Sequence, residues 1–257
     1  MESAVERAIT FITERYSEPL SLSDVANSAI LSRFHFCRIF RDATGVTPGR
    51  FLSAVRIYQA KRMLATTAMN VTEVAFAVGF NSLGSFSNHF TDSVGISPGR
   101  FRQAARGADV EATPAQWGLP PRGVPVTATI TLPSGYACGP LYLGAFDTPI
   151  IQRQPACSII VEAAEGDYVL PTVPPGTWFL RAVVVADSAA PEPWTRRTLL
   201  VGGAGPVTVE PGASPFVKIE LRPRQRTDLP ILLALPDLEP QRARSAEAAI
   251  EEPARVG

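Results

Sequence analysis

One segment of this chain occurs twice, and the second copy begins fifty residues after the first. Residues 40–51 read FRDATGVTPGRF and residues 90–101 read FTDSVGISPGRF. The stretches upstream also match, because residues 22–26 (LSDVA) resemble residues 71–75 (VTEVA). A repeat at nearly constant spacing predicts one supersecondary motif used twice, and therefore a duplicated binding surface.

The composition divides the chain into two parts near residue 106. At 257 residues the chain is long enough for two domains. The first 105 residues contain 11 Lys plus Arg and 8 Asp plus Glu, a net charge of +3. Since the whole chain has 24 of each sign, the remainder carries −3. A mildly basic first part suits a polyanionic partner, whereas the acidic second part does not.

Apolar periodicity and cap residues predict about seven helices in the first part. The predicted segments are residues 3–16, a helix capped by Ser21 or Ser23, residues 32–45, residues 47–66, a helix that starts at Asn70 or Thr72, residues 82–95 and residues 98–105. The second and third helices, and again the fifth and sixth, have helix-turn-helix spacing. The fourth helix, at ~1.5 Å per residue, would span ~28 Å, close to the ~34 Å between successive major grooves on one side of B-DNA.

Three segments carry a family resemblance. SRFHFCRIF at residues 32–40, RIYQAKRML at residues 56–64 and VAFAVGFNS at residues 74–82 resemble the tandem helix-turn-helix DNA-binding domain of AraC/XylS-type transcriptional regulators. The resemblance covers about residues 3–104 and extends through GISP at residues 95–98. It implies an all-α domain over residues 1–106 that binds double-stranded DNA as a monomer and places two recognition helices in adjacent major grooves.

The resemblance also assigns the residues of the first recognition helix. It makes Phe34, Cys37 and Arg38 the base-facing residues and places Arg33, His35 and Arg41 nearer the DNA backbone. An arginine can donate two hydrogen bonds to O6 and N7 of guanine, and a phenylalanine can contact a thymine methyl group. The alternative to DNA contact is that these residues lie on a helix face that is exposed to solvent and binds nothing.

The second recognition helix departs from the family pattern. Leu83 and Gly84 bring neither charge nor a side-chain hydrogen bond, whereas Asn88 can pair with adenine. We therefore expect the second helix to hold phosphates through its serines and its N-terminus more than it reads bases. The residues expected at this second contact are Ser82, Leu83, Gly84, Ser85, Ser87 and Asn88.

The second part of the chain predicts an all-β domain. Residues 107–122 contain Pro114, Pro120 and Pro121 and are expected to be an extended linker. Short β-type runs separated by Pro and Gly over residues 123–235 predict a β-sandwich. The apolar run at residues 229–235 predicts a final strand or a docking segment, and residues 236–257 predict a tail that is disordered or a marginal helix. The expected strands are 124–132, 139–146, 158–163, 168–173, 177–186, 198–201, 206–209 and 216–221. The hairpin at residues 166–182 (GDYVLPTVPPGTWFLRA) resembles those of prealbumin-like and carboxypeptidase-regulatory-like sandwiches.

Catalytic, metal and cofactor chemistry receives little support from the residues. The only histidines, His35 and His89, are 54 positions apart and lack neighbouring carboxylates at ligand spacing. Four scattered acidic residues in the second part are more typical of solvated turns than of a cation site. They are Asp147, Asp187, Glu192 and Asp228. No catalytic set is visible, so we expect no enzyme, no cofactor and no bound metal.

The cysteines and the apolar runs indicate the cellular compartment of the protein. Cys37, Cys138 and Cys157 are odd in number and contain no CxxC spacing, which favours a reducing cytoplasm. The longest apolar runs fall short of the ~18 residues of a membrane span, so no membrane partner is expected.

These observations together predict a cytoplasmic, sequence-specific DNA-binding transcriptional regulator. RNA polymerase is a candidate second partner, and the β domain would bind a small-molecule effector or a second copy of the chain. The competing hypothesis is a carbohydrate- or protein-binding module whose β-sandwich carries the function.

Overall fold

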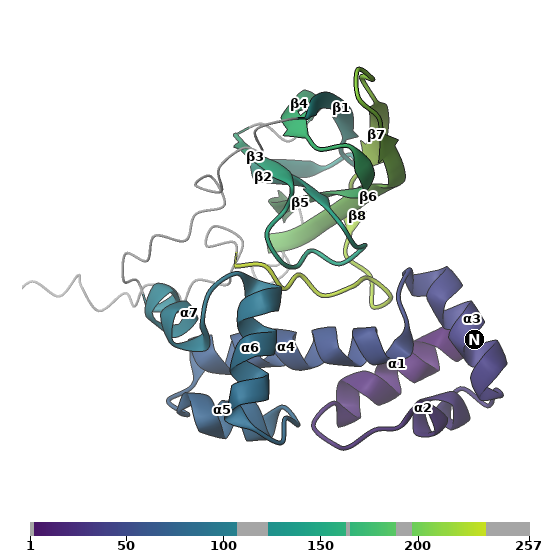
Figure 1. Cartoon of the computed structure of the whole chain (residues 1–257), viewed down its shortest axis with the longest axis vertical. Coiled ribbons are helices and arrows are strands. Elements are labelled where there is room, and N and C mark those ends of the chain that lie inside the picture. The colour runs from purple at the N-terminus through teal and green to yellow at the C-terminus, as the bar shows by residue number, and fades with distance from the viewer. Residues whose placement is uncertain (1–2, 107–122, 163–164, 189–196, 235–257) are drawn as a thin grey trace, which may run out of the picture.

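The computed structural model describes residues 3–106, 123–162, 165–188 and 197–234 (Figure 1). A helical part, which we call the head, precedes two β-sheets, which we call the β lobe. The linker expected at residues 107–122 and the tail expected at residues 236–257 lie outside the described residues.

Seven helices form the head within residues 3–106. They are α1 (Ala4–Arg15), α2 (Leu22–Ser28), α3 (Arg33–Thr44), α4 (Pro48–Thr66), α5 (Val71–Ala77), α6 (Leu83–Val94) and α7 (Pro98–Ala105). Of the alternative caps, Ser21 and Asn70 begin α2 and α5, each in a reciprocal capping box. α3 and α6 both end at a glycine in the left-handed conformation, with φ of 77° at Gly45 and 91° at Gly95.

Each repeat buries the same set of three phenylalanines. In the first, Phe36 and Phe40 have ring centroids 5.3 Å apart and Phe40 meets Phe51 edge-on at 5.4 Å. In the second, the corresponding distances are 5.6 Å for Phe86 to Phe90 and 5.7 Å for Phe90 to Phe101. These edge and tilted contacts are the favourable arrangements of aromatic rings. They explain why the sequence repeats at this spacing: each recognition helix is anchored to the helix after it.

The β lobe consists of two sheets over the described residues. Its strands are β1 (Val124–Thr131), β2 (Tyr136–Phe146), β3 (Cys157–Val161), β4 (Gly166–Val173), β5 (Gly176–Ser188), β6 (Arg197–Val209), β7 (Phe216–Glu220) and β8 (Arg222–Pro223). One sheet has the order β4-β1-β7 and the other β3-β2-β5-β6-β8, with β1 and β7 parallel. Alternate residues of β1 are buried in a core that both sheets share. A β-rich second part is thus confirmed, while its membership of the prealbumin-like sandwiches stays a prediction.

The strands expected at 198–201 and 206–209 are one strand, β6, so that expectation was wrong. The glycines that suggested a break lie inside the ladder, where the neighbouring chain approaches closely. A β-carbon at Gly202 would lie 2.7 Å from the carbonyl oxygen of Glu220, and one at Gly203 would collide with the Arg181 guanidinium. Glycine is needed there for space rather than for a turn.

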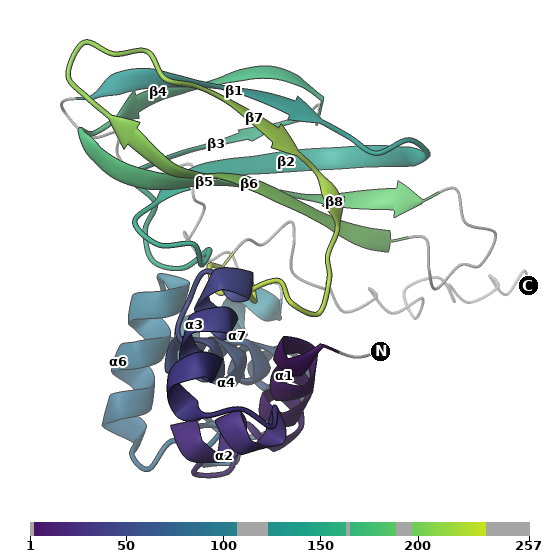
Figure 2. The same cartoon turned by 90° about the vertical axis from the view of Figure 1, so that its right-hand side faces the viewer.

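Two segments of the β lobe return to the head. One is residues 147–153, between β2 and β3, which we call the docking loop; the other is residues 224–234, after β8, which we call the strap. In Figure 2 the strap leaves β8 and runs down onto the helices. Ile150, Leu232 and Ala234 are buried in the apolar core of the head, not in that of the β lobe. Of the two possibilities for the apolar run after residue 228, a final strand or a docking segment, the described residues adopt the second.

We predict that Gly79→Ala lowers the free energy of unfolding by at least ~2 kcal/mol, because a left-handed, crowded site would gain a side chain. Gly79 has φ of 86°, and an added β-carbon would lie 2.7 Å from the carbonyl oxygen of Ser17. Gly49→Ala is the matched control, since nothing lies within 4 Å of its added β-carbon. Urea unfolding should show the control unchanged or stabilised by up to ~1 kcal/mol. Equal effects of the two substitutions would contradict this account.

Candidate nucleic-acid interface

The outer face of α3 is almost entirely exposed. Phe36, Phe40 and Thr44 point into the core of the head, and Ile39 packs against it. Cys37 is half-buried, and the other predicted contact residues are exposed: Arg33, Phe34, His35, Arg38 and Arg41. Phe34 is 94% exposed, an unusual state for a large apolar side chain. A helix with one anchored face and one free face is suited to entering a groove.

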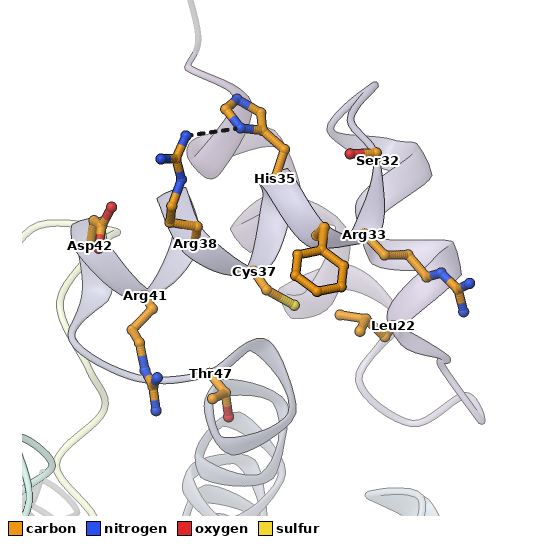
Figure 3. Close-up of a pocket in the computed structure, with 10 residues that line it drawn as sticks. Leu22, Ser32, Arg33, His35, Cys37, Arg38, Arg41, Asp42 and Thr47 are labelled. Carbon is orange, nitrogen blue, oxygen red and sulfur yellow. Dashed lines mark hydrogen bonds between the residues drawn. The ribbon is translucent and has the colours of Figure 1, made fainter.

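All six residues expected at the first DNA contact line one shallow concavity of about 950 Å³ (Figure 3). They are Arg33, Phe34, His35, Cys37, Arg38 and Arg41. Arg38 Nη2 lies 3.4 Å from His35 Nδ1, which accepts the hydrogen bond when that nitrogen carries no proton. Three arginines and an exposed ring on one surface supply both the charge and the apolar contact that a groove of DNA requires.

The concavity also includes residues whose place there no sequence motif indicates. Leu22 of α2, Ser32, Asp42 and Thr47 complete its wall. Thr47 caps α4 by accepting a hydrogen bond from the Arg50 amide at 3.4 Å. Thr47 and Pro48 are a pair typical of a helix start, but the sequence alone does not show that this start lies beside α3.

The face of α6 is equally open, but its first two turns carry no Lys, Arg, Asp or Glu side chain. Phe86 and Phe90 point inward, while the predicted contact residues are exposed except for Ser87, which is half-buried. Ser82 is engaged in capping, since its Oγ accepts from the Ser85 amide at 3.2 Å. A phosphate at this helix start would therefore be held mainly by the free amides of Leu83 and Gly84.

The histidines and acidic residues do not meet in a metal site. His89 Nε2 lies 2.7 Å from Ser53 Oγ of α4, which ties α6 to the connecting helix. Asp147 and Asp228 are paired with Arg153 and Arg222, respectively. Glu192 lies outside the described residues, and among those described no three His, Cys, Asp or Glu side chains could together hold a metal ion.

A second hollow, of about 690 Å³, lies where the β lobe meets the end of α3. Thr44 and Gly45 form its wall on the head, and Phe179, Arg181 and Asp228 are among its residues from the β lobe. Burial lowers the pKa of Arg181, and the charge of Asp228 partly offsets this. Burial opposes the ionisation of Asp228, but hydrogen bonds from Arg222 and from a backbone amide outweigh it and lower that pKa.

Comparison with known proteins agrees with the geometry of the head. A helix-turn-helix domain family matches residues 25–104, a span that contains both repeats. These residues form a helix-turn-helix domain. The chain is 35% identical over 82 residues to the uncharacterized HTH-type transcriptional regulator YdeC of Bacillus subtilis, a match of 32% of this chain and 28% of that protein. It is 29% identical over 85 residues to the lactose operon transcription activator of Staphylococcus xylosus, which covers 33% of this chain and 30% of that protein.

A solved structure, the DNA-binding domain of AdpA in complex with a target DNA, has 33% identity and a TM-score of 0.39 and covers 41% of this chain and 95% of that one. The chain thus spans less than a third of the length of the two regulators. Those relatives are transcriptional regulators and activators, which are not enzymes, in agreement with the expectation for this chain. Over the described residues, no helix combines the length and the apolarity needed to traverse a lipid bilayer.

We predict that the two phenylalanines of α3 behave oppositely. Phe36→Ala should lower the free energy of unfolding by ~3–5 kcal/mol, because Phe36 is fully buried. Phe34→Ala should change it by no more than ~0.5 kcal/mol, because that ring makes little contact within the chain. Urea unfolding followed by circular dichroism measures both. A large loss at Phe34 would mean that the ring packs within the protein and is not free for a partner.

Proposed function

We propose that this protein is a sequence-specific DNA-binding transcriptional regulator that inserts α3 and α6 into adjacent major grooves. The observation that carries the proposal is the pairing of two helix-turn-helix units, each with its phenylalanines buried and its outer recognition face free. They are joined by the 19-residue α4. At ~1.5 Å per residue this helix spans ~28 Å, comparable with the ~34 Å repeat of the major groove.

The two contacts would differ in kind. α3 presents Phe34, Cys37 and Arg38 and would carry most of the base reading. α6 presents Asn88 and an uncharged helix start and would serve chiefly to fix the protein on the phosphate backbone. Sequence preference should therefore be concentrated in the half of the site that α3 occupies.

The β lobe would supply regulation rather than DNA contact. Two of its arginines near the head are engaged within the chain: Arg222 pairs with Asp228 at 2.5 Å, and Arg224 lies 5.6 Å from the ring of Tyr58 on α4. The hollow between the lobes offers a small-molecule effector a place next to the end of α3. Self-association through the sheets and contact with RNA polymerase remain the other proposed roles.

A carbohydrate- or protein-binding role of the β lobe has less support. Trp178, which could belong to an aromatic platform, packs against the core of the β lobe and donates its Nε1–H to the Pro174 carbonyl at 2.8 Å. A stacking platform needs a ring with a free face.

Selection of double-stranded fragments from a random pool by the purified full chain at physiological salt tests the proposed function. Protection should cover two segments about one helical turn apart. Affinity should fall with salt, with a slope of about 0.9 per phosphate contact. Protection of a single segment, or binding that does not respond to salt, would refute the proposal.

We predict that Arg38→Ala costs ~1–3 kcal/mol of binding free energy and relaxes the preference at one or two base pairs, because a bidentate contact to guanine is lost. Asn88→Ala should cost less. Binding of each variant to a library randomised across the selected site measures the effect at every position. Arg15→Ala, which removes an exposed arginine of α1 paired with Glu18, is the control and should leave base preference unchanged. A greater loss of specificity at Asn88 than at Arg38 would reverse the assignment.

A further inference from the structure

The docking loop and the strap touch both helix-turn-helix units at once. Pro149 of the docking loop packs against Gly45 at the end of α3, where an added β-carbon would lie 3.5 Å from the proline ring. At the end of α6, the Arg153 amide donates to the Ser93 carbonyl at 2.9 Å, and the Ala234 amide donates to the Val94 carbonyl at 3.0 Å. The same surface of the β lobe therefore meets the carboxyl ends of both recognition helices (Figure 1).

The middle of this interface lies on the helix that joins the two units. Lys61 of α4 is only 3% exposed. Its ammonium donates to the strap carbonyls of Leu233 at 3.0 Å and Ile231 at 3.4 Å, and it lies 5.5 Å from the ring of Phe101 on α7. A buried ammonium is costly unless fixed polar partners surround it, so this contact holds the strap in one position.

The two segments are also tied to each other and to the sheet. The amides of Leu232 and Leu233 both donate to the Ile151 carbonyl, at 2.8 and 3.1 Å. Arg181 of β5 donates its Nε–H to the Pro149 carbonyl at 2.9 Å. An ion pair of 2.9 Å between Arg153 and Asp92 adds a connection to α6. The docking loop, the strap and the sheet are thus connected to one another, so the two segments contact the head as one rigid unit.

Without this unit, the two recognition helices are joined chiefly through α4. One further contact exists where Ser17 lies against Gly79, supported by Arg56, whose guanidinium donates to the carbonyls of Tyr16 and Glu18 at 2.7 Å. Long helices bend, and a small bend of α4 would move the outer ends of α3 and α6 relative to each other. A second bridge between their other ends would suppress that motion.

We infer that the β lobe sets the relative position of the two recognition helices, and thereby the spacing between the two DNA segments that the protein accepts. This inference rests on the proposed DNA-binding function and assigns Lys61 and Leu232 as positioning residues. One added base pair shifts the second segment by 3.4 Å and turns it by roughly 34–36°. A head held by the β lobe cannot follow that change, whereas a head held only by α4 and the Ser17–Gly79 contact can bend to do so.

The test uses the full chain and the DNA site that it selects, with one base pair inserted or deleted between the two contacted segments. Leu232→Asp places a charge where the strap is 1% exposed in the core of the head, and Leu232→Met is its volume-conserving control. Lys61→Met removes the same contact by a change in the head, because its ammonium binds the strap carbonyls. This second variant provides the test if Leu232→Asp fails to fold. Glu18→Gln, an exposed ion-pair residue remote from the β lobe interface, serves as a surface control.

Wild type and both controls should lose about tenfold in affinity for the altered spacings, a loss comparable with that of a mismatched contact. Leu232→Asp and Lys61→Met should lose no more than about threefold, while their affinity for a single half-site stays within twofold of wild type. A uniform loss of affinity with the tenfold spacing preference intact would show that the strap only stabilises the fold, and would overturn the inference alone. Tighter binding of Leu232→Asp and Lys61→Met at the original spacing would also overturn it, because the β lobe would then oppose DNA binding rather than position the helices for it. Failure of the wild type to select any DNA would overturn the proposed function and this inference together.

Discussion

The burial of three phenylalanines in each repeat is the constraint on which the rest of the head depends. Each fully buried ring contributes ~1.5–3 kcal/mol, with more from the edge contacts between rings. Because Phe36 and Phe40, like Phe86 and Phe90, are four residues apart, they fix which face of the recognition helix turns inward. The opposite face is then exposed by geometry, and a residue such as Phe34 is presented there because its position on the helix points to solvent.

This arrangement separates stability from recognition. The residues that hold α3 and α6 in place lie on the inner face, so the outer face can vary without loss of the fold. The difference between the two copies follows from this: α3 carries arginines and an exposed ring, while α6 carries serines, a glycine and an asparagine. The two copies share the buried phenylalanines and differ on the outer face, so under the proposed function the two surfaces perform different parts of DNA binding.

The sequence predicted the head far better than the β lobe. Helix periodicity, the Thr-Pro and Ser-Pro caps and the glycine ends are local signals, and the observed helices follow them to within one or two residues. In the β lobe, Gly202 and Gly203 suggested a break between strands, because sequence alone does not reveal that Arg181 and the chain at Glu220 lie against them. The role of the Ser82 hydroxyl was open for the same reason, since a helix cap and a phosphate ligand have the same sequence pattern.

By itself, the sequence determined the duplicated motif, its helices, its aromatic anchors and the side chains on the outer face of each recognition helix. These depend on contacts between residues close along the chain, whose spacing is fixed by the helical repeat. Only the tertiary structure decided that Ile150 and Leu232 of the second part belong to the core of the head, and that the Lys61 ammonium is held by the strap. That interface joins residues about 170 positions apart. The strap sequence is short and apolar, and without the fold it could equally have been a final strand.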